Sequence, residues 1–384
     1  MQVQQIYQLV NDATQSAIGA TAVVNEDLSN LVDIGTALFN ANAVDNYVKA
    51  LVDRIGKTIF VDRAYQGHAP KVLMDSWEFG SVVEKIRGDL PDASENESWN
   101  LVDGASYDPN IFYKPAVSVK FFNSKTTFEV DVSFTTKQVK ESFLSTGQMN
   151  GFLSMIQNEV EKSLTVKYDQ LIMRTIDAMV AETVYDDYQG GALSASSGAK
   201  AINLLYLYNT AKGTSLTAAN AILDKDFLTY ASQQIKLYVE RIGAMSTVFN
   251  VGGKKRFTPK ELLHVVMLAD FEAGALAYAQ APTFWKELIE LPGHQTIPFW
   301  QGSGTGWGFS DVSKIDVVTP SGHTQQVTGV LACLFDRDAC GVTQIDRRTT
   351  TNWNAKAEFY TNFAKSDAGY FNDLDENCIV FFVA

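Results

Sequence analysis

Residues 152–182 read FLSMIQNEVEKSLTVKYDQLIMRTIDAMVAE, and this stretch decides the fold because it predicts one unbroken helix. Neither Gly nor Pro interrupts the chain from Phe152 to Gln189. On an amphipathic helix, apolar side chains recur every three or four residues and form one stripe. The stripe consists of Leu153, Ile156, Val160, Leu164, Tyr168, Leu171, Thr175 and Met179. At about 1.5 Å per residue, the predicted helix would be about 46 Å long.

The segments on either side of this helix predict a mixture of strands and helices. Upstream, the residues from Phe128 to Phe134 alternate between apolar and polar, which predicts a strand with one buried face. Val117–Phe121 alternates in the same way, and Asn123-Ser124 between the two segments predicts a hairpin turn. Downstream, we expect helices at Asp226–Ile242 and Phe271–Gln280, and strands at Ile315–Val318, Val327–Leu334, Ala357–Phe363 and Cys378–Val383. The predicted fold class is therefore α+β.

The N-terminal region predicts only short helices. Leu28, Leu31, Ile34 and Leu38 have helical spacing, and Val44–Ile55 suggests a second short helix. Neither helix is long enough to hold a core alone, so we expect an arm that packs on another surface.

A long segment before the first alternating strand is the candidate binding surface. Arg87–Asn110 reads RGDLPDASENESWNLVDGASYDPN, a composition typical of turns rather than of packed elements. Aromatic residues in and around this segment would have no role in a solvated linker, so we expect them to pack against another surface. The candidate inter-subunit contacts are Trp77, Trp99, Tyr107, Phe112 and Tyr113. The alternative is that they fold back on their own domain.

Composition and charge exclude several classes of protein. The chain has 384 residues, 46% of them hydrophobic, which excludes a disordered chain. Its 31 Lys and Arg against 44 Asp and Glu give a net charge of −13, which argues against a nucleic-acid reader and against docking on anionic membranes. No basic and apolar secretory leader opens the sequence, and no apolar run reaches the roughly 18 residues of a membrane span. The odd number of cysteines, three, predicts reduced thiols that pack in the core.

The motifs that usually carry chemistry are incomplete. Gly56-Lys57-Thr58 resembles the end of a phosphate-binding loop, but Leu51 stands where the first glycine is required. The glycines of Gly302–Gly308 fall at every second position, which is the wrong spacing for a dinucleotide loop. The four histidines lack the spacing of metal ligands, and nothing predicts a base beside Cys340. The sequence therefore predicts no catalytic, cofactor-binding or metal-binding residue.

Three further clusters have structural interpretations. Glu182, Asp186 and Asp187 are expected to form the solvated end of the long helix. The basic residues of Gly252–Arg256 are expected in a charged turn. Thr258–Glu261 has the Thr-x-x-Glu spacing of a capping box, with Pro at the first helical position.

The order of these parts, together with four scattered patches, resembles the major capsid proteins of tailed phages, which have the Hong Kong 97-type fold. At residue level the sequence is most similar to the shell proteins of short-tailed phages of the phi-29 kind. The patches are Leu51–Gly56, the Phe152…Ile156…Asn158 pattern running to Lys167-Tyr168-Asp169, Leu263–Ala273, and Leu334–Asp338. They extend over most of the chain from about residue 40.

The resemblance implies a division into four parts. These are an N-terminal arm at 1–60, an extended β-hairpin loop at 61–123, a peripheral domain with the spine helix at 124–191 and 346–384, and an axial domain at 192–345. The phi-29-type protein has an additional C-terminal immunoglobulin-like domain, whereas this sequence ends at Ala384.

The resemblance also implies a function without enzymatic turnover. Copies of the chain would assemble as hexamers and pentamers into the icosahedral head of a tailed phage, inside the host bacterial cytoplasm. A scaffolding protein and a portal would take part, and the finished virion would enclose double-stranded DNA without sequence-specific binding. Because packaged DNA must slide, we expect the inner surface of the shell to be neutral or negative.

Two other functions remain open on the sequence. An encapsulin-like nanocompartment subunit would share the fold but enclose cargo enzymes. A soluble α/β enzyme is disfavoured by the scattered histidines and the missing cofactor loops.

Overall fold

The computed structural model describes residues 11–12, 14–15, 19, 65, 67–72, 82–91, 93–96, 99–106, 108, 110–135, 146–280, 292–301, 306–357 and 359–384. The short helices predicted in the N-terminal arm lie outside these residues. The chain divides into two compact units. The first comprises Met1–Tyr65, Val130–Ser163 and Thr350–Phe363, and the second comprises Gln66–Glu129, Leu164–Thr349 and Ala364–Ala384.

The predicted long helix is confirmed as α5, Thr146–Tyr188, which contributes residues to both units and is longer at each end than the sequence indicated. The predicted stripe is buried at Leu164, Leu171 and Met179. Towards its C-terminal end the helix is buried on all sides, since five consecutive residues from Val180 to Val184 are inaccessible or nearly so. The helix stops where Gln189 and Gly190 take left-handed backbone angles, with φ of 49° and 76°.

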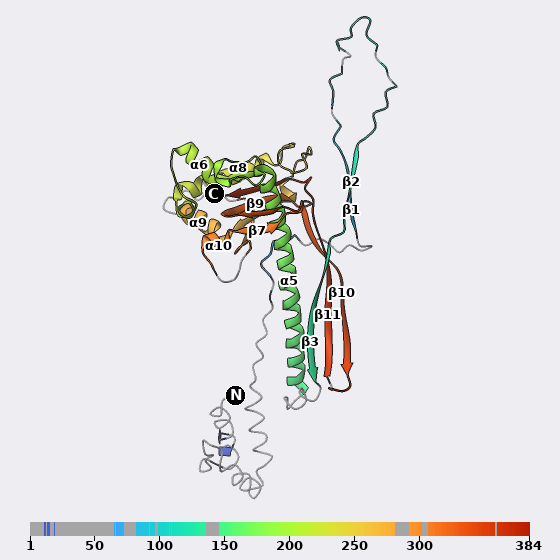
Figure 1. Ribbon diagram of the computed structural model, residues 1–384, viewed down its shortest axis with the longest axis vertical. Coiled ribbons are helices and arrows are strands. Elements are labelled where there is room, and N and C mark those ends of the chain that lie inside the picture. The colour runs from blue at the N-terminus through green and yellow to red at the C-terminus, as the bar shows by residue number, and fades with distance from the viewer. Residues whose placement is uncertain are drawn as a thin grey trace. The chain divides into compact units, whose positions relative to one another are not determined.

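A five-stranded sheet forms the centre of the second unit (Figure 1). Its order is β4 (Ala201–Asn203), β12 (Cys378–Phe382), β9 (Val330–Asp336), β5 (Leu263–Leu268) and β6 (Gln295–Ile297). β9 is antiparallel to both β12 and β5, whereas the edge strands β4 and β6 are parallel to their neighbours. Every residue of β9 and β12 is buried. Strands buried on both faces read as continuous apolar runs, as these two do.

Each face of this sheet has its own core. Cys333, Phe335 and Val380 point to the face covered by α5, where they meet Ile176 and Val180. The intervening residues of the sheet point to the other face, which is covered by α6 (Leu204–Lys212), α8 (Lys225–Arg241) and α9 (Ala269–Gln280) (Figure 1). The predicted helices at Asp226–Ile242 and Phe271–Gln280 are thus confirmed as α8 and α9.

Local capping explains where two helices of this layer, α6 and α8, begin. The side chain of Asn203 accepts a hydrogen bond from the Tyr206 amide at the start of α6. Asp224 does the same for the Phe227 amide at the start of α8. Short elements complete the layer and its connections: η2 (Leu193–Ala195), α7 (Ala218–Ala221), η3 (Lys260–Leu262) and α10 (Phe309–Val312).

The remaining strands form three smaller sheets. β10 (Cys340–Asn354), β11 (Phe359–Asn372) and β3 (Lys125–Thr135) make a three-stranded sheet in that order. β7 (Ile315–Val318) pairs with β8 (Thr324–Val327), and β1 (Val83–Gly88) pairs with β2 (Val117–Phe122). The predicted strands at Ile315–Val318 and Cys378–Val383 are confirmed. The strand predicted at Val327–Leu334 begins later, at Val330, because Gly329 has a left-handed φ of 75°.

The structure corrects two turn predictions. Asn123-Ser124 is not a hairpin turn, because β2 pairs with β1 whereas β3 lies beside β11 in another sheet. Thr258 does not cap a helix: its hydroxyl is buried and donates to Asp336 Oδ2 at 2.8 Å, and the short η3 turn has no side-chain cap.

Candidate inter-subunit interface

The described aromatic residues of the extended loop between β1 and β2 are exposed in the single chain. The exposed fractions of Trp99, Phe112 and Tyr113 are 94%, 85% and 80%. Trp77 and Tyr107 lie outside the described residues. Large aromatic side chains are the residues that most often anchor protein interfaces. The described part of the loop therefore offers three such anchors to a partner.

The β1–β2 hairpin at the base of this loop has a mostly apolar outer face, on which Glu84 is the charged residue. In its register Ile86 pairs with Val119, and Phe121 and Val117 point to the same side. These four side chains are between 45% and 65% exposed. A hairpin on a protein surface normally turns its polar side to the solvent. The outer face of β1–β2 therefore continues the apolar surface of the loop.

The inner face of the hairpin carries three cations, which reach carboxylates just before the C-terminal strand β12 and in the turn between β9 and β10. Lys85 Nζ lies 2.7 Å from Asp373 Oδ2, and Lys120 Nζ lies 2.6 Å from Asp375 Oδ2. Arg87 Nη2 lies 2.7 Å from Glu376 Oε1 and 3.3 Å from Asp338 Oδ2. We call these three cations and four carboxylates the basal ion cluster.

The two most buried carboxylates of the basal ion cluster differ in their electrostatics, although each side chain is only 3% exposed. Burial favours the neutral form of Asp373, but hydrogen bonds and charge from Lys85 and Lys120 outweigh it and lower its pKa. For Glu376, burial dominates the opposing charges of Arg87 and Lys85 and raises the pKa. Its Oε1 is close to Arg87 but makes no well-directed hydrogen bond, which accounts for the difference.

Sequence reasoning missed this cluster. The alternation of Lys85, Arg87 and Lys120 with apolar residues was the available signal, but it does not reveal which face of a hairpin is covered. The partners lie more than 250 residues further along the chain: Arg87 contacts Asp338, and Lys85 and Lys120 both contact Asp373.

The prediction that Glu182, Asp186 and Asp187 form a solvated end of the long helix is wrong, because these carboxylates have partners within the chain. Glu182 is buried and accepts hydrogen bonds from the amide and hydroxyl of Ser321. Asp187 accepts from the backbone amide of Lys200 and pairs with its ammonium group at 2.8 Å. Asp186 is also paired with Lys200. These carboxylates fasten the helix to segments that sequence spacing cannot reveal.

Groups that are usually reactive are held in unreactive surroundings. Cys340 is fully buried, and burial raises the pKa of its thiol. Burial also lowers the pKa of His264, with a contribution from Arg337 that outweighs the opposite effect of Asp336. Among the described residues, no group of three or more His, Cys, Asp or Glu side chains is arranged to hold a metal ion. Nor does that part of the chain contain a helix with the length and hydropathy needed to cross a membrane.

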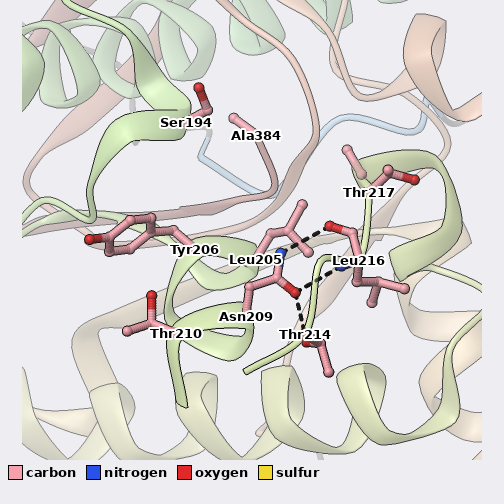
Figure 2. Close-up of a pocket in the computed structure, with 10 residues that line it drawn as sticks. Ser194, Leu205, Tyr206, Asn209, Thr210, Thr214, Leu216, Thr217 and Ala384 are labelled. Carbon is pink, nitrogen blue, oxygen red and sulfur yellow. Dashed lines mark hydrogen bonds between the residues drawn. The ribbon is translucent and has the colours of Figure 1, made fainter. Parts of the chain in front are cut away.

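A depression of about 500 Å³ lies between α6 and the segment that follows it (Figure 2). Its lining contains Asn209, whose amide accepts from the Thr214 hydroxyl and the Leu216 amide and donates to the Leu216 carbonyl (Figure 2). Asn209 thus holds the wall of the depression together. None of the lining side chains is a carboxylate, amine, imidazole or thiol.

Comparisons with known proteins identify a family by sequence and similar folds among solved structures. Residues 7–382 match the family model described as Phi29-like phage major capsid protein. The capsid structure of Staphylococcus phage Andhra is 11% identical, with a TM-score of 0.56 over 85% of this chain and 87% of that chain. A chain in the structure of the head fiber and inner core protein gp22 of native bacteriophage P68 is 9% identical, with a TM-score of 0.53 over 85% of this chain and 87% of that chain. No curated protein matches the sequence.

Proposed function

Because the chain belongs to the Phi29-like phage major capsid protein family, we propose that its extended loop joins neighbouring copies in the shell of a phage head. Family membership confirms the resemblance drawn from the sequence, and the Hong Kong 97-type fold is confirmed with it. The chain is a shell protein that assembles with copies of itself, and its place is in the virion. The encapsulin-like alternative has no support in the comparisons.

The observation that carries the loop proposal is the exposure of Trp99, Phe112 and Tyr113 in a single chain. Exposed aromatic side chains on a segment without a core of its own gain little within one copy. In a shell, each copy has neighbours that can cover these side chains. The apolar outer face of β1–β2, with Phe121 65% exposed, supports the same conclusion.

The wider account of assembly also forms part of the proposal. The copies form hexamers and pentamers of an icosahedral shell in the host cytoplasm, with a scaffolding protein and a portal of a short-tailed phage. The chain turns over no substrate. The division into arm (1–60), loop (61–123), peripheral domain (124–191 and 346–384) and axial domain (192–345) belongs to the same proposal.

Replacing the loop tests its role. A full deletion of Arg87–Asn110 would also remove Arg87 from the basal ion cluster, so the sharper variant replaces residues 91–114 with a short Gly-Ser linker. This variant keeps the hydrogen bond from the Asp89 amide to the Ala116 carbonyl, 2.8 Å, that closes the hairpin. We expect a folded chain that forms no closed shells in electron micrographs. A matched control replaces only the exposed polar residues 94–96 and should still form shells. Normal shells from the linker variant would contradict the proposal.

The charge of the chain supports a proposal about the shell lumen. The chain has a net charge of −13, and a shell that grips DNA tightly would impede its packaging. We propose that double-stranded DNA is enclosed without sequence-specific binding behind a neutral or negative inner surface. An electrostatic map of the assembled particle checks this, and a strongly basic lumen would overturn it.

A further inference from the structure

The polarity of the β1–β2 hairpin is reversed relative to that of an ordinary surface hairpin. Lys85, Arg87 and Lys120 lie on the inner face, whereas Ile86 and Val119 lie on the outer face and are exposed. Placing charges inward is costly unless each charge is paired. A hydrophobic inner face would have fastened the hairpin without that cost. The inward charges therefore call for an explanation other than stability.

The basal ion cluster ties the hairpin to two short segments of the second unit, the turn at Asp338 and the stretch from Asp373 to Glu376. Lys85 pairs with Asp373 at 2.7 Å, and its ammonium group also donates to the Asp338 carbonyl at 2.8 Å. Lys120 reaches both Asp373, at 3.0 Å, and Asp375, at 2.6 Å. Each cation of the hairpin thus has at least two acceptors, and both strands are held.

The acceptors are themselves fixed in position. The Asp373 amide donates to the Ala339 carbonyl at 2.7 Å, and the Asp375 amide donates back to Asp373 Oδ1 at 3.2 Å. The hairpin also contacts the ring of Phe371: the Phe122 and Phe371 ring centroids are 5.0 Å apart, and Lys85 Nζ lies 5.5 Å from the centroid of the Phe371 ring. A two-stranded hairpin is marginal by itself, so its direction depends on these attachments.

Directed ion pairs at the base of a long segment define its orientation more sharply than apolar packing does, because each pair requires a particular distance and angle. A small rotation of β1–β2 would break several of these pairs together. The extended loop continues from both strands, so a change of angle at the base displaces the aromatic anchors at Trp99, Phe112 and Tyr113.

We propose that Lys85, Arg87 and Lys120 are positioning residues, which aim the extended loop at the neighbouring copy through the basal ion cluster. This inference rests on the proposed role of the loop in assembly. The cluster acts on shell formation through the direction of the loop, and the cations themselves need not touch the neighbour.

Lys85→Met tests this role, because it keeps the length of the side chain and removes its charge. In the unassembled full-length chain, we expect amide hydrogen exchange of β1 and β2 to become at least about tenfold faster, with exchange in β9 and β12 unchanged. In electron micrographs we expect open or irregular assemblies in place of uniform shells. Lys85→Arg, which restores the cation, should return both measurements to those of the wild type. Lys314→Met is the matched control, since Lys314 forms an exposed pair with Asp316 at 3.6 Å outside the cluster.

A second variant covers the case in which Lys85→Met does not fold, because it leaves Asp373 without its closest partner. Lys85→Met combined with Asp373→Asn removes both charges of the pair and recovers folding. We expect this double variant to fold but still to assemble irregularly. Uniform shells from this double variant, or hairpin exchange unchanged in Lys85→Met, would overturn the inference.

The two proposals fail in distinguishable ways. If the linker variant of residues 91–114 forms normal shells, the role of the loop in assembly is wrong. If that variant forms no shells but Lys85→Met and the double variant Lys85→Met with Asp373→Asn both form uniform ones, only the positioning role is wrong.

Discussion

The exposed aromatic residues of the loop allow folding and assembly to be separated in one experiment. The perturbation is the triple change Trp99→Ala, Phe112→Ala and Tyr113→Ala. In the single chain these side chains are 94%, 85% and 80% exposed. Their truncation therefore removes almost no contact within the chain, and we expect the free energy of unfolding to change by less than about 0.5 kcal/mol.

The expected effect on assembly is much larger. An aromatic side chain buries about 150–250 Å² when it is covered, and truncation of an interface anchor usually costs about 2 kcal/mol or more. About 2 kcal/mol corresponds to roughly a thirtyfold change in an association constant. Phe112 and Tyr113 are adjacent, so their effects need not add. We therefore expect the protein concentration at which shells form to rise by at least about thirtyfold.

The assay measures shell formation against protein concentration by light scattering and electron microscopy, beside urea unfolding of the unassembled chain. Trp99→Phe keeps an aromatic anchor and should lose much less than Trp99→Ala. Trp307→Ala removes an exposed tryptophan outside the loop, 67% exposed, and should assemble as the wild type does. Assembly of the triple variant at the wild-type concentration would refute the reasoning, as would a large loss of its unfolding free energy.

Three further predictions concern the body of the protein. Gly329→Ala should lower the unfolding free energy by at least about 2 kcal/mol, measured by urea unfolding, because φ is 75° and the new methyl group would collide with the Val383 carbonyl. Asp177→Asn should raise the free energy of unfolding by about 1–3 kcal/mol at pH 8 and change it little at pH 4. Burial raises the pKa of the Asp177 carboxyl, so ionising it destabilises the folded chain, and this destabilisation grows as the pH rises. An equal effect of the substitution at both pH values in thermal unfolding would contradict this. The stabilisation that Asp373 gives to the basal ion cluster should persist as the pH falls towards 3.8 and decline below it, because the pKa of Asp373 in the folded chain is lowered from that value. The difference in unfolding free energy between wild type and Asp373→Asn should therefore be nearly as large at pH 4.5 as at pH 6 and smaller at pH 3; a difference that is already lost at pH 4.5 would contradict this.

Elements with strong periodicity could be predicted from the sequence. The long helix and α8 have apolar residues at helical spacing, and β12 is a short continuous apolar run, so the type and approximate position of these elements were predicted correctly. Bounds were less accurate where a single backbone angle decides them, as at Gly329. The aromatic candidates came from composition alone: a turn-rich segment that carries Trp99 has few explanations other than a covering partner.

What could not be predicted depends on contacts between distant parts of the chain. The alternation in Val117–Phe122 indicates a two-faced strand, but it does not identify β1 as the partner or show that the charged face points inward. Glu182 looked solvated because its partner, Ser321, is 139 residues away. Thr258 matched a capping pattern, yet its hydroxyl is used by Asp336. In each case a polar side chain found a tertiary partner that outweighed the local signal.

The most direct test of the central claim is a cryo-electron microscopy structure of the assembled shell, resolved to side chains. The account predicts that Trp99, Phe112 and Tyr113, all exposed in the single chain, are covered by a neighbouring copy, and that Lys85 still pairs with Asp373. A closed shell in which all three aromatic side chains remain exposed to solvent would contradict it.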